Sequence, residues 1–204
     1  MAPTHLCAIA MEDGSVCLYD LAAKLWSTHK LCNTQQREVR ALAWQPASGT
    51  VLAVGCTAGV CLWRIAFSGT TGALSGGHMQ RVLPHAPVSC LAWHPLGSWL
   101  VAGSDQLGVV SLWAGGETSS AVSLWARGGG GVSILSISNC GGMLLAGWVS
   151  GGVRLYETRT WSWRTWEAFR GKRCVAAAWS GPAPLSSKGP RTLLVSFEGE
   201  PQLH

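Results

Sequence analysis

The chain has few charged side chains. Charged residues make up 12% of the 204 residues, whereas about 25% is usual in a soluble domain. This shortage indicates that part of the surface is covered by other protein. The ten Asp and Glu residues are not expected to form a carboxylate pair inside a strand-and-turn site, so the paired carboxylates of many acid–base enzymes are not predicted.

The motifs of common catalytic and metal sites are missing too. None of the eight cysteines forms a Cys-x-x-Cys pair, which argues against a structural zinc site. There is no G-x-S-x-G motif, and no Lys-Ser or Lys-Thr follows Gly128–Gly131. We interpret this glycine run as a flexible connection rather than a phosphate cradle. The sequence therefore predicts no catalytic residue, no cofactor and no bound metal, and a protein that is not an enzyme.

Long apolar runs and a basic N-terminal segment are also lacking. No window of about 20 uninterrupted apolar residues occurs, so a direct membrane span is not expected. Met1–Ala10 lacks the basic region of a secretory signal peptide. Reduced cysteines in the cytosol or nucleus are the natural interpretation.

A repeated block of three short apolar strands fills most of the chain. Val88–Trp113 contains three such strands, separated by turns rich in Gly, Pro and Asp. The block recurs at Val39–Trp63 and at Val132–Tyr156. Cys174–Phe197 supplies the first two strands of another unit, and Leu6–Tyr19 the second and third strands of an earlier one.

The spacing within this block is nearly constant. The ends of the first and third strands lie 19 or 20 residues apart in the three complete units. The onward connections are long enough for a fourth strand, as in Ala121–Ala126 and Ser162–Glu167. One insertion, Phe67–His78, is rich in Gly, Ser and Thr and is predicted to be a surface loop. A period of about 40–45 residues with four strands is typical of WD-repeat β-propellers.

Large side chains recur at equivalent strand ends, and we interpret them as core positions. They are Tyr19, Trp44, Trp63, Trp93, Trp113, Tyr156 and Trp179. His85 fits the histidine slot that precedes a blade, but Asp13 alone fits the aspartate position in the turn before the third strand. The blades are therefore expected to depend on apolar burial more than on a buried polar network.

The predicted fold is all-β: an incomplete WD40-type β-propeller with about four blades of a probable seven, forming an open arc. It is treated as a single segment over residues 1–204. The blades are predicted at 39–85, 88–126 and 132–167, with partial blades at 1–31 and 174–204. The polar stretch Pro182–Pro190 is predicted to be a loop, and GEPQLH at 199–204 is predicted to occupy a third-strand position.

Two surface features permit more than one interpretation. The basic residues are scattered and are densest at Arg170, Lys172 and Arg173. We interpret them as a solvated rim, because a nucleic-acid face would need a basic stripe with exposed aromatics. Trp161, Trp163 and Trp166 form WSWRTW. Trp161 and Trp163 are expected to share one strand face and Trp166 the other, so these rings either pack in the core or form a partner patch.

Several runs, in order, resemble the aladin family of WD-repeat nucleoporins. They are AMEDGSVCLYD, VRALAWQPASGTVLAVGCTAGVCLW, PHAPVSCLAWHPLGSWLVAGS and RGGGGVSIL, followed by GEP at 199–201. The chain departs from the family at Ser136–Ser138, where most blades have an aromatic residue followed by Ser-Pro, and in its longer last-blade loop.

The resemblance implies a non-enzymatic scaffold protein of the nuclear pore complex at the nuclear envelope. Its implied role is support of protein import, and its implied partners are other nucleoporins, including a transmembrane anchor. The resemblance covers about blades 1 to 5 of the family's propeller, so the chain is expected to be a partial one. The alternative is a generic WD-repeat adaptor, such as a ubiquitin-ligase substrate receptor, in the cytoplasm.

Overall fold

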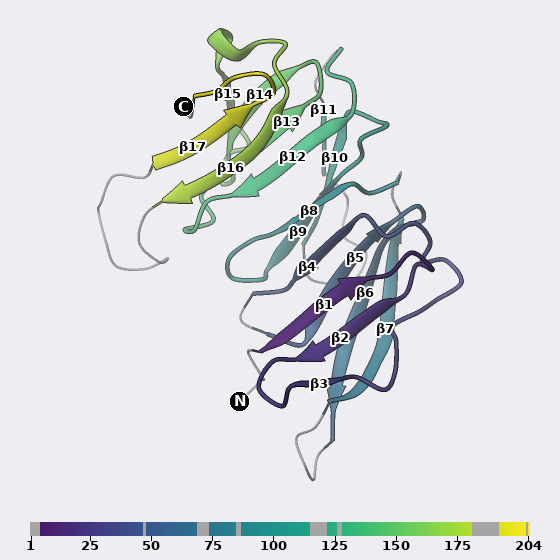
Figure 1. Ribbon diagram of the computed structural model, residues 1–204. Coiled ribbons are helices and arrows are strands. Elements are labelled where there is room, and N and C mark those ends of the chain that lie inside the picture. The colour runs from purple at the N-terminus through teal and green to yellow at the C-terminus, as the bar shows by residue number, and fades with distance from the viewer. Residues whose placement is uncertain are drawn as a thin grey trace. The chain divides into compact units, whose positions relative to one another are not determined.

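The computed structural model describes residues 5–46, 48–68, 74–84, 87–114, 122–125, 128–180, 192–202 and 204. Antiparallel sheets make up the described regular structure, apart from one short 3-10 turn (Figure 1). The chain divides into two compact units, residues 1–91 and 92–204. The boundary falls within strand β8 (Cys90–Trp93). None of the described helices has the length and apolar character needed to cross a membrane.

The first unit contains two complete sheets. The three-stranded sheet has the order β1-β2-β3, with β1 at Leu6–Ala10, β2 at Val16–Asp20 and β3 at Leu25–Trp26. The four-stranded sheet has the order β4-β5-β6-β7. Its strands are β4 at Ala41–Trp44, β5 at Val51–Cys56, β6 at Gly59–Phe67 and β7 at Leu74–Pro84. Strand β3 adds a short fourth strand to the partial first blade.

Two further four-stranded sheets have the same meander. One has β8, β9 at Trp99–Gly103, β10 at Val109–Ala114 and β11 at Val122–Trp125. The other has β12 at Val132–Ile137, β13 at Met143–Trp148, β14 at Gly152–Glu157 and β15 at Trp163–Thr165. The 3-10 turn η1 at Glu167–Phe169 follows, and then β16 at Cys174–Ser180 pairs with β17 at Thr192–Phe197. The fourth strands predicted in 121–126 and 162–167 are therefore present.

Two details of the predicted connections can be compared with the sheets. The insertion at 67–78 is not all loop, because Leu74–His78 belongs to β7 and pairs with the extended end of β6. In this part of the ladder Gly77 and Gly76 are opposite Ile65 and Ala66. Val195 and His204 exchange both backbone hydrogen bonds, at 2.8 and 3.0 Å. His204 therefore lies beside β17, where a third strand was predicted. The loop predicted at 182–190 lies outside the described residues.

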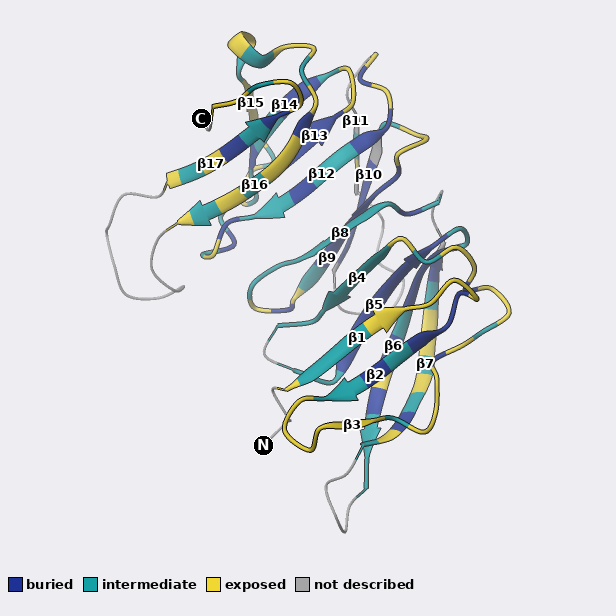
Figure 2. Cartoon of the chain, viewed as in Figure 1, coloured by how far each residue is buried: buried dark blue, intermediate teal, exposed yellow. Residues whose placement is uncertain are grey.

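The middle strands carry the core of each sheet (Figure 2). All six residues of β5 are buried, as are five of the six in β13. Sheets covered on both faces show such continuous apolar runs rather than strict alternation. In the first unit, Val16 and Leu18 of β2 pack with Leu52 and Val54 of β5 in one cluster. In the second unit, Leu145 of β13 packs in a cluster with residues of β16 and β17.

The large residues at the repeat positions differ in their burial. The third-strand residues Trp63, Trp113 and Tyr156 are buried, with 5%, 7% and 2% of their surface exposed. Tyr19 and the first-strand residues are partly buried; the latter are Trp44, Trp93 and Trp179. First-strand ends therefore retain some accessible surface. His85 lies outside the described residues.

A buried polar relay centred on Gln36 joins the two sheets of the first unit, beside the apolar cluster that these sheets share. Gln36, only 3% exposed, accepts a 2.7 Å hydrogen bond from Trp63 Nε1. Its amide nitrogen donates to the carbonyls of Gly14 and Leu31, at 2.8 and 3.0 Å. Gln36 lies as far before Trp44 as His85 lies before Trp93. A glutamine thus fills the histidine slot of this blade.

We expect Gln36→Glu to lower the free energy of unfolding by about 2 kcal/mol at neutral pH. The new carboxylate would keep the bond from Trp63 but would face the carbonyls of Gly14 and Leu31 as a third acceptor. Protonation would restore one donor, so the pKa of the new carboxyl would be higher in the folded state. The deficit should therefore shrink as the pH falls.

Urea unfolding between pH 5 and 8 measures this effect. Gln35→Glu, at the exposed neighbouring position, is the matched control and should change stability by less than about 0.5 kcal/mol. Equal losses for both variants would show that the relay does not stabilise the unit.

Among the described residues, Ser15 and Lys30 are the partners of Asp13, and no histidine is. The Asp13 carboxylate accepts hydrogen bonds from the hydroxyl and the backbone N–H of Ser15, and it forms an ion pair with Lys30 at 3.3 Å. These contacts lower the pKa of the Asp13 carboxyl to about 2. The Ser15 hydroxyl contributes most to this shift, followed by the Ser15 N–H and then by Lys30. The aspartate therefore organises its own turn rather than a longer network.

Candidate partner-binding site

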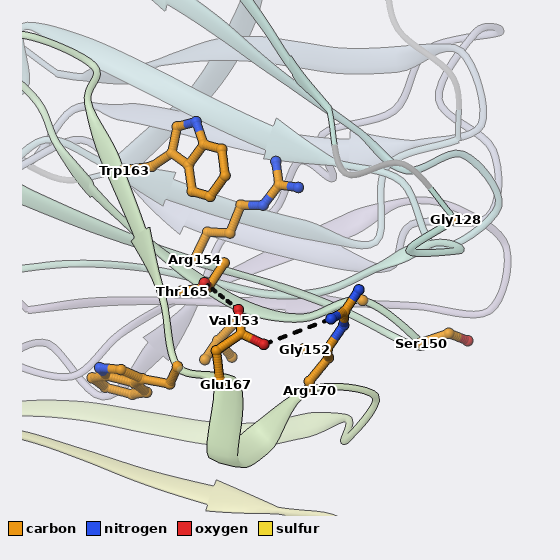
Figure 3. Close-up of a pocket in the computed structure, with 11 residues that line it drawn as sticks. Gly128, Ser150, Gly152, Val153, Arg154, Trp163, Thr165, Glu167 and Arg170 are labelled. Carbon is orange, nitrogen blue, oxygen red and sulfur yellow. Dashed lines mark hydrogen bonds and ion pairs between the residues drawn. The ribbon is translucent and has the colours of Figure 1, made fainter.

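A cavity of about 400 Å³ opens in the second unit at one end of the sheet β12–β15 (Figure 3). The turn between β13 and β14, the strands β14 and β15, the turn η1 and the Gly128 turn supply its walls. We call it the Arg154 cavity. It is lined by Gly128, Ser150, Gly151, Gly152, Val153, Arg154, Trp163, Thr165, Trp166, Glu167 and Arg170.

Arg154 lies along one wall with its side chain beside Trp163 (Figure 3). The guanidinium carbon is 4.4 Å from the centre of the Trp163 ring and 5.4 Å from that of Trp148. In the ladder, Arg154 is opposite Thr165 and Tyr156 is opposite Trp163, so Arg154 and Trp163 are diagonal neighbours on one sheet face. Cation–π attraction to two rings holds the guanidinium in place.

Tyr156 lies on the same face of β14 and interacts with Arg154. Burial raises the pKa of the Tyr156 hydroxyl, and the hydrogen bond and positive charge of Arg154 oppose that rise. The hydroxyl therefore stays protonated at neutral pH. Arg154 is thus fixed from two directions, by aromatic faces and by a phenol.

Trp148, the last residue of β13, supports the Arg154 side chain with its ring. Its side chain is fully buried, and its Nε1 donates a 2.9 Å hydrogen bond to the carbonyl of Gly108 in the preceding sheet. The sequence did not single out Trp148 as a site residue, because Trp148 ends a second strand and the other blades have Cys56 and Ser104 at that place. All three residues are buried, so alignment of the second-strand ends could have found the position.

The opposite wall holds a second arginine and the one acidic side chain among the described residues that line the cavity. Glu167 accepts a 3.1 Å hydrogen bond from the Thr165 hydroxyl and lies 3.7 Å from the Arg170 guanidinium. Both side chains of this ion pair are largely exposed, so it adds little stability. The wall can therefore rearrange when another charged group approaches.

The three tryptophans of WSWRTW occupy three different environments. Trp161 precedes β15, has a left-handed φ of 55° and lies edge-on to Trp99 in the preceding sheet, 6.0 Å away. Trp163 is 51% exposed in β15, whereas Trp166 packs against Phe169 and the cluster around Leu145. The prediction that Trp161 and Trp163 share a strand face is wrong, because the turn at Trp161 breaks the alternation. The partner patch stays a prediction, with Trp163 its most exposed member.

The basic group after η1 is paired rather than arranged as a stripe. Arg170, Lys172 and Arg173 form ion pairs with Glu167, Glu200 and Glu198. This pattern agrees with a solvated rim.

All eight cysteines are free thiols. Within the described residues, no three His, Cys, Asp or Glu side chains gather closely enough to hold a metal ion.

Two WD40 family models match parts of the chain. The family model of the anaphase-promoting complex subunit 4 WD40 domain matches residues 2–94, and that of the WD domain, G-beta repeat, matches residues 77–113. Aladin of Arabidopsis thaliana is 28% identical over 186 residues, which cover 82% of this chain and 40% of that protein. The chain therefore spans less than half of this relative.

A solved structure supports the same fold. A chain of the mitotic checkpoint complex crystal structure superposes with a TM-score of 0.73 at 18% identity. The match covers 97% of this chain and 57% of that one. Together with the sheets described above, these matches confirm the predicted all-β fold, an incomplete set of WD40-type propeller blades.

Proposed function

We propose, on the premise that this chain is a partial aladin-like WD-repeat protein, that it is a scaffold component of the nuclear pore complex. In this role it supports nucleocytoplasmic transport of proteins from a position at the nuclear envelope. The observation that carries the proposal is the likeness to aladin over 186 residues. The WD40-type fold supports the scaffold role, since such blades present loops and edges to partners.

The proposed activity is binding and not catalysis. The Arg154 cavity is lined by arginine, tryptophan, threonine and glycine, with neither histidine nor cysteine among its described lining residues. Its acidic lining residue, Glu167, accepts a hydrogen bond from Thr165 and pairs with Arg170 on an exposed wall, so its carboxylate is already engaged by neighbouring side chains. These side chains suit recognition of a charged partner.

The proposed partners are other nucleoporins, including a transmembrane anchor, with no direct contact to nucleic acid. The pairing of Arg170, Lys172 and Arg173 with glutamates supports this choice, because a nucleic-acid face needs cations directed at phosphates. A generic WD-repeat adaptor, cytoplasmic and acting as a ubiquitin-ligase substrate receptor, is the second candidate. The match of residues 2–94 to a subunit of a different multiprotein complex favours it.

Affinity purification separates the two candidates. The chain, tagged and expressed in cells, is expected to co-purify with pore proteins and to give a fluorescent nuclear rim. Trp148→Ala, which removes a fully buried side chain, serves as a misfolding control and should lose both signals. Recovery of ligase subunits without pore proteins would contradict the pore assignment and support the adaptor.

A further inference from the structure

We propose that the Arg154 cavity binds an acidic, extended peptide segment of a protein partner, whose carboxylates lie against Arg154 and Arg170. The inference rests on the proposed scaffold function and deepens it by naming the chemistry of a partner. It does not depend on the cellular location of the chain.

The charge around the cavity favours an acidic occupant. Residues 154–173 hold six Arg or Lys and two Glu, a net charge of +4, whereas the whole chain carries +5. Lys172 and Arg173 of this segment are paired with Glu200 and Glu198. Among the described residues that line the cavity, Arg154 and Arg170 outnumber the single acid Glu167, so the lining has a net positive charge. Complementary charge of this kind steers a partner and fixes its register.

The geometry of Arg154 suits a carboxylate better than a diffuse negative surface. Its guanidinium lies over the rings of Trp163 and Trp148, so its orientation is set before a ligand arrives. A planar guanidinium presents its N–H groups as a fork that matches the two oxygens of a carboxylate. Because the cation is already ordered, binding costs less side-chain entropy than it would at a mobile lysine.

The opposite wall already holds a carboxylate of the protein itself. Glu167 accepts from Thr165 and pairs with Arg170, which shows that this wall accommodates the chemistry proposed for the ligand. Since the Glu167–Arg170 pair is exposed and 3.7 Å apart, Arg170 can turn to a second carboxylate at little cost. The cavity can then hold one acidic side chain at each arginine.

A peptide fits these walls better than RNA does. Arg154 covers one face of Trp163, and Trp166 packs against Phe169, so these two indoles leave at most the second face of Trp163 for the base stacking on which single-stranded RNA depends. A phosphodiester chain carries a charge at every nucleotide and would meet the Glu167 carboxylate. A peptide can place a neutral residue there. The exposed outer strand β15 leaves room for an extended backbone alongside.

Binding of a labelled peptide to the full 204-residue chain tests the proposal. The probe is a fluorescein-labelled decapeptide of Glu and Asp with a central Leu, and its Lys counterpart and oligouridylate RNA are compared with it by anisotropy. We expect the acidic probe to bind and Arg154→Gln to raise its Kd at least about tenfold, as expected for loss of a charged hydrogen-bonded pair. Arg170→Gln should raise the Kd of the acidic probe about threefold. The Kd of Arg154→Lys should lie between those of wild type and Arg154→Gln, because a positive charge without the planar fork retains part of the binding.

Arg159→Gln is the matched control. Arg159 lies in the same basic segment, its side chain is 82% exposed, and it is outside the cavity; its loss should change the Kd less than about twofold. Circular dichroism of each variant establishes that it is folded. Equal weakening by Arg159→Gln, binding of RNA more tightly than of the acidic probe, or no binding of the probe would each overturn the proposal. Capture of pore proteins is measured separately, so failure of the peptide assay leaves the scaffold function standing.

Discussion

Gly131→Ala is expected to lower the free energy of unfolding by at least about 3 kcal/mol, at the upper end of the cost of overpacking. A Cβ atom at this position would lie 1.6 Å from the carbonyl oxygen and 2.1 Å from the carbonyl carbon of Asp105. Both contacts are far inside van der Waals distance, and the atoms are backbone. No rotamer change can relieve the clash.

The backbone on both sides of this contact is fixed by hydrogen bonds. Val132 N–H donates to the carbonyl of Ser104 at 2.6 Å, and Val149 N–H donates to the carbonyl of Gly131 at 2.9 Å. A shift that made room for a methyl group would therefore break the Val132–Ser104 bond, which joins adjacent sheets of the second unit, or the Val149–Gly131 bond within the sheet β12–β15. The steric cost and the broken bonds add to each other.

Gly128→Ala is the matched control for Gly131→Ala. Gly128 has a φ of 68°, and an added Cβ would meet nothing within 4 Å. Its substitution should therefore cost only the left-handed strain, about 1–2 kcal/mol. Urea unfolding of both variants measures the difference. Losses of the same size would contradict the close packing of Gly131 on Asp105.

The glycine run shows where sequence reasoning reached its limit. The repeat spacing predicted the sheets over 39–85, 88–126 and 132–167, because apolar strands and turn residues recur at nearly fixed intervals. It also led us to interpret Gly128–Gly131 as a flexible connection. That interpretation is wrong for Gly131, which the structure packs tightly, because its partner Asp105 lies in the turn of another repeat. Periodicity within one repeat contains no information about such a contact.

The polar relay and the cavity were missed for similar reasons. Gln36 carries no apolar signal, and its role emerges from three partners that lie on separate strands and turns. The Arg154 cavity depends on a diagonal pairing across β14 and β15 and on the turn after β15. WSWRTW drew attention to the correct segment, but the left-handed turn at Trp161 is invisible to a period-two pattern. Sequence spacing therefore located the strands better than it located the side-chain constellations between them.

Trp148→Ala should lower the free energy of unfolding by about 3–5 kcal/mol, the usual cost of removing a large core aromatic. Trp148 is among the largest fully buried side chains of the protein. Its removal would leave a cavity where β13 approaches the preceding sheet. It would also leave the Gly108 carbonyl without the indole donor 2.9 Å away, which costs more than the loss of packing alone.

Two further substitutions separate packing from the hydrogen bond. Trp148→Phe keeps an aromatic ring but lacks the hydrogen-bond donor, so it should retain part of the packing energy. Its free energy of unfolding should therefore lie between those of wild type and Trp148→Ala. Trp163→Ala removes the other ring that contacts Arg154, yet half of its surface is exposed, so it should cost about 1 kcal/mol or less. Urea unfolding followed by circular dichroism avoids the change in intrinsic fluorescence. If Trp163→Ala destabilised the chain as much as Trp148→Ala, the cavity wall rather than the sheet core would be the source of stability, and the assignment of Trp148 as its anchor would be wrong.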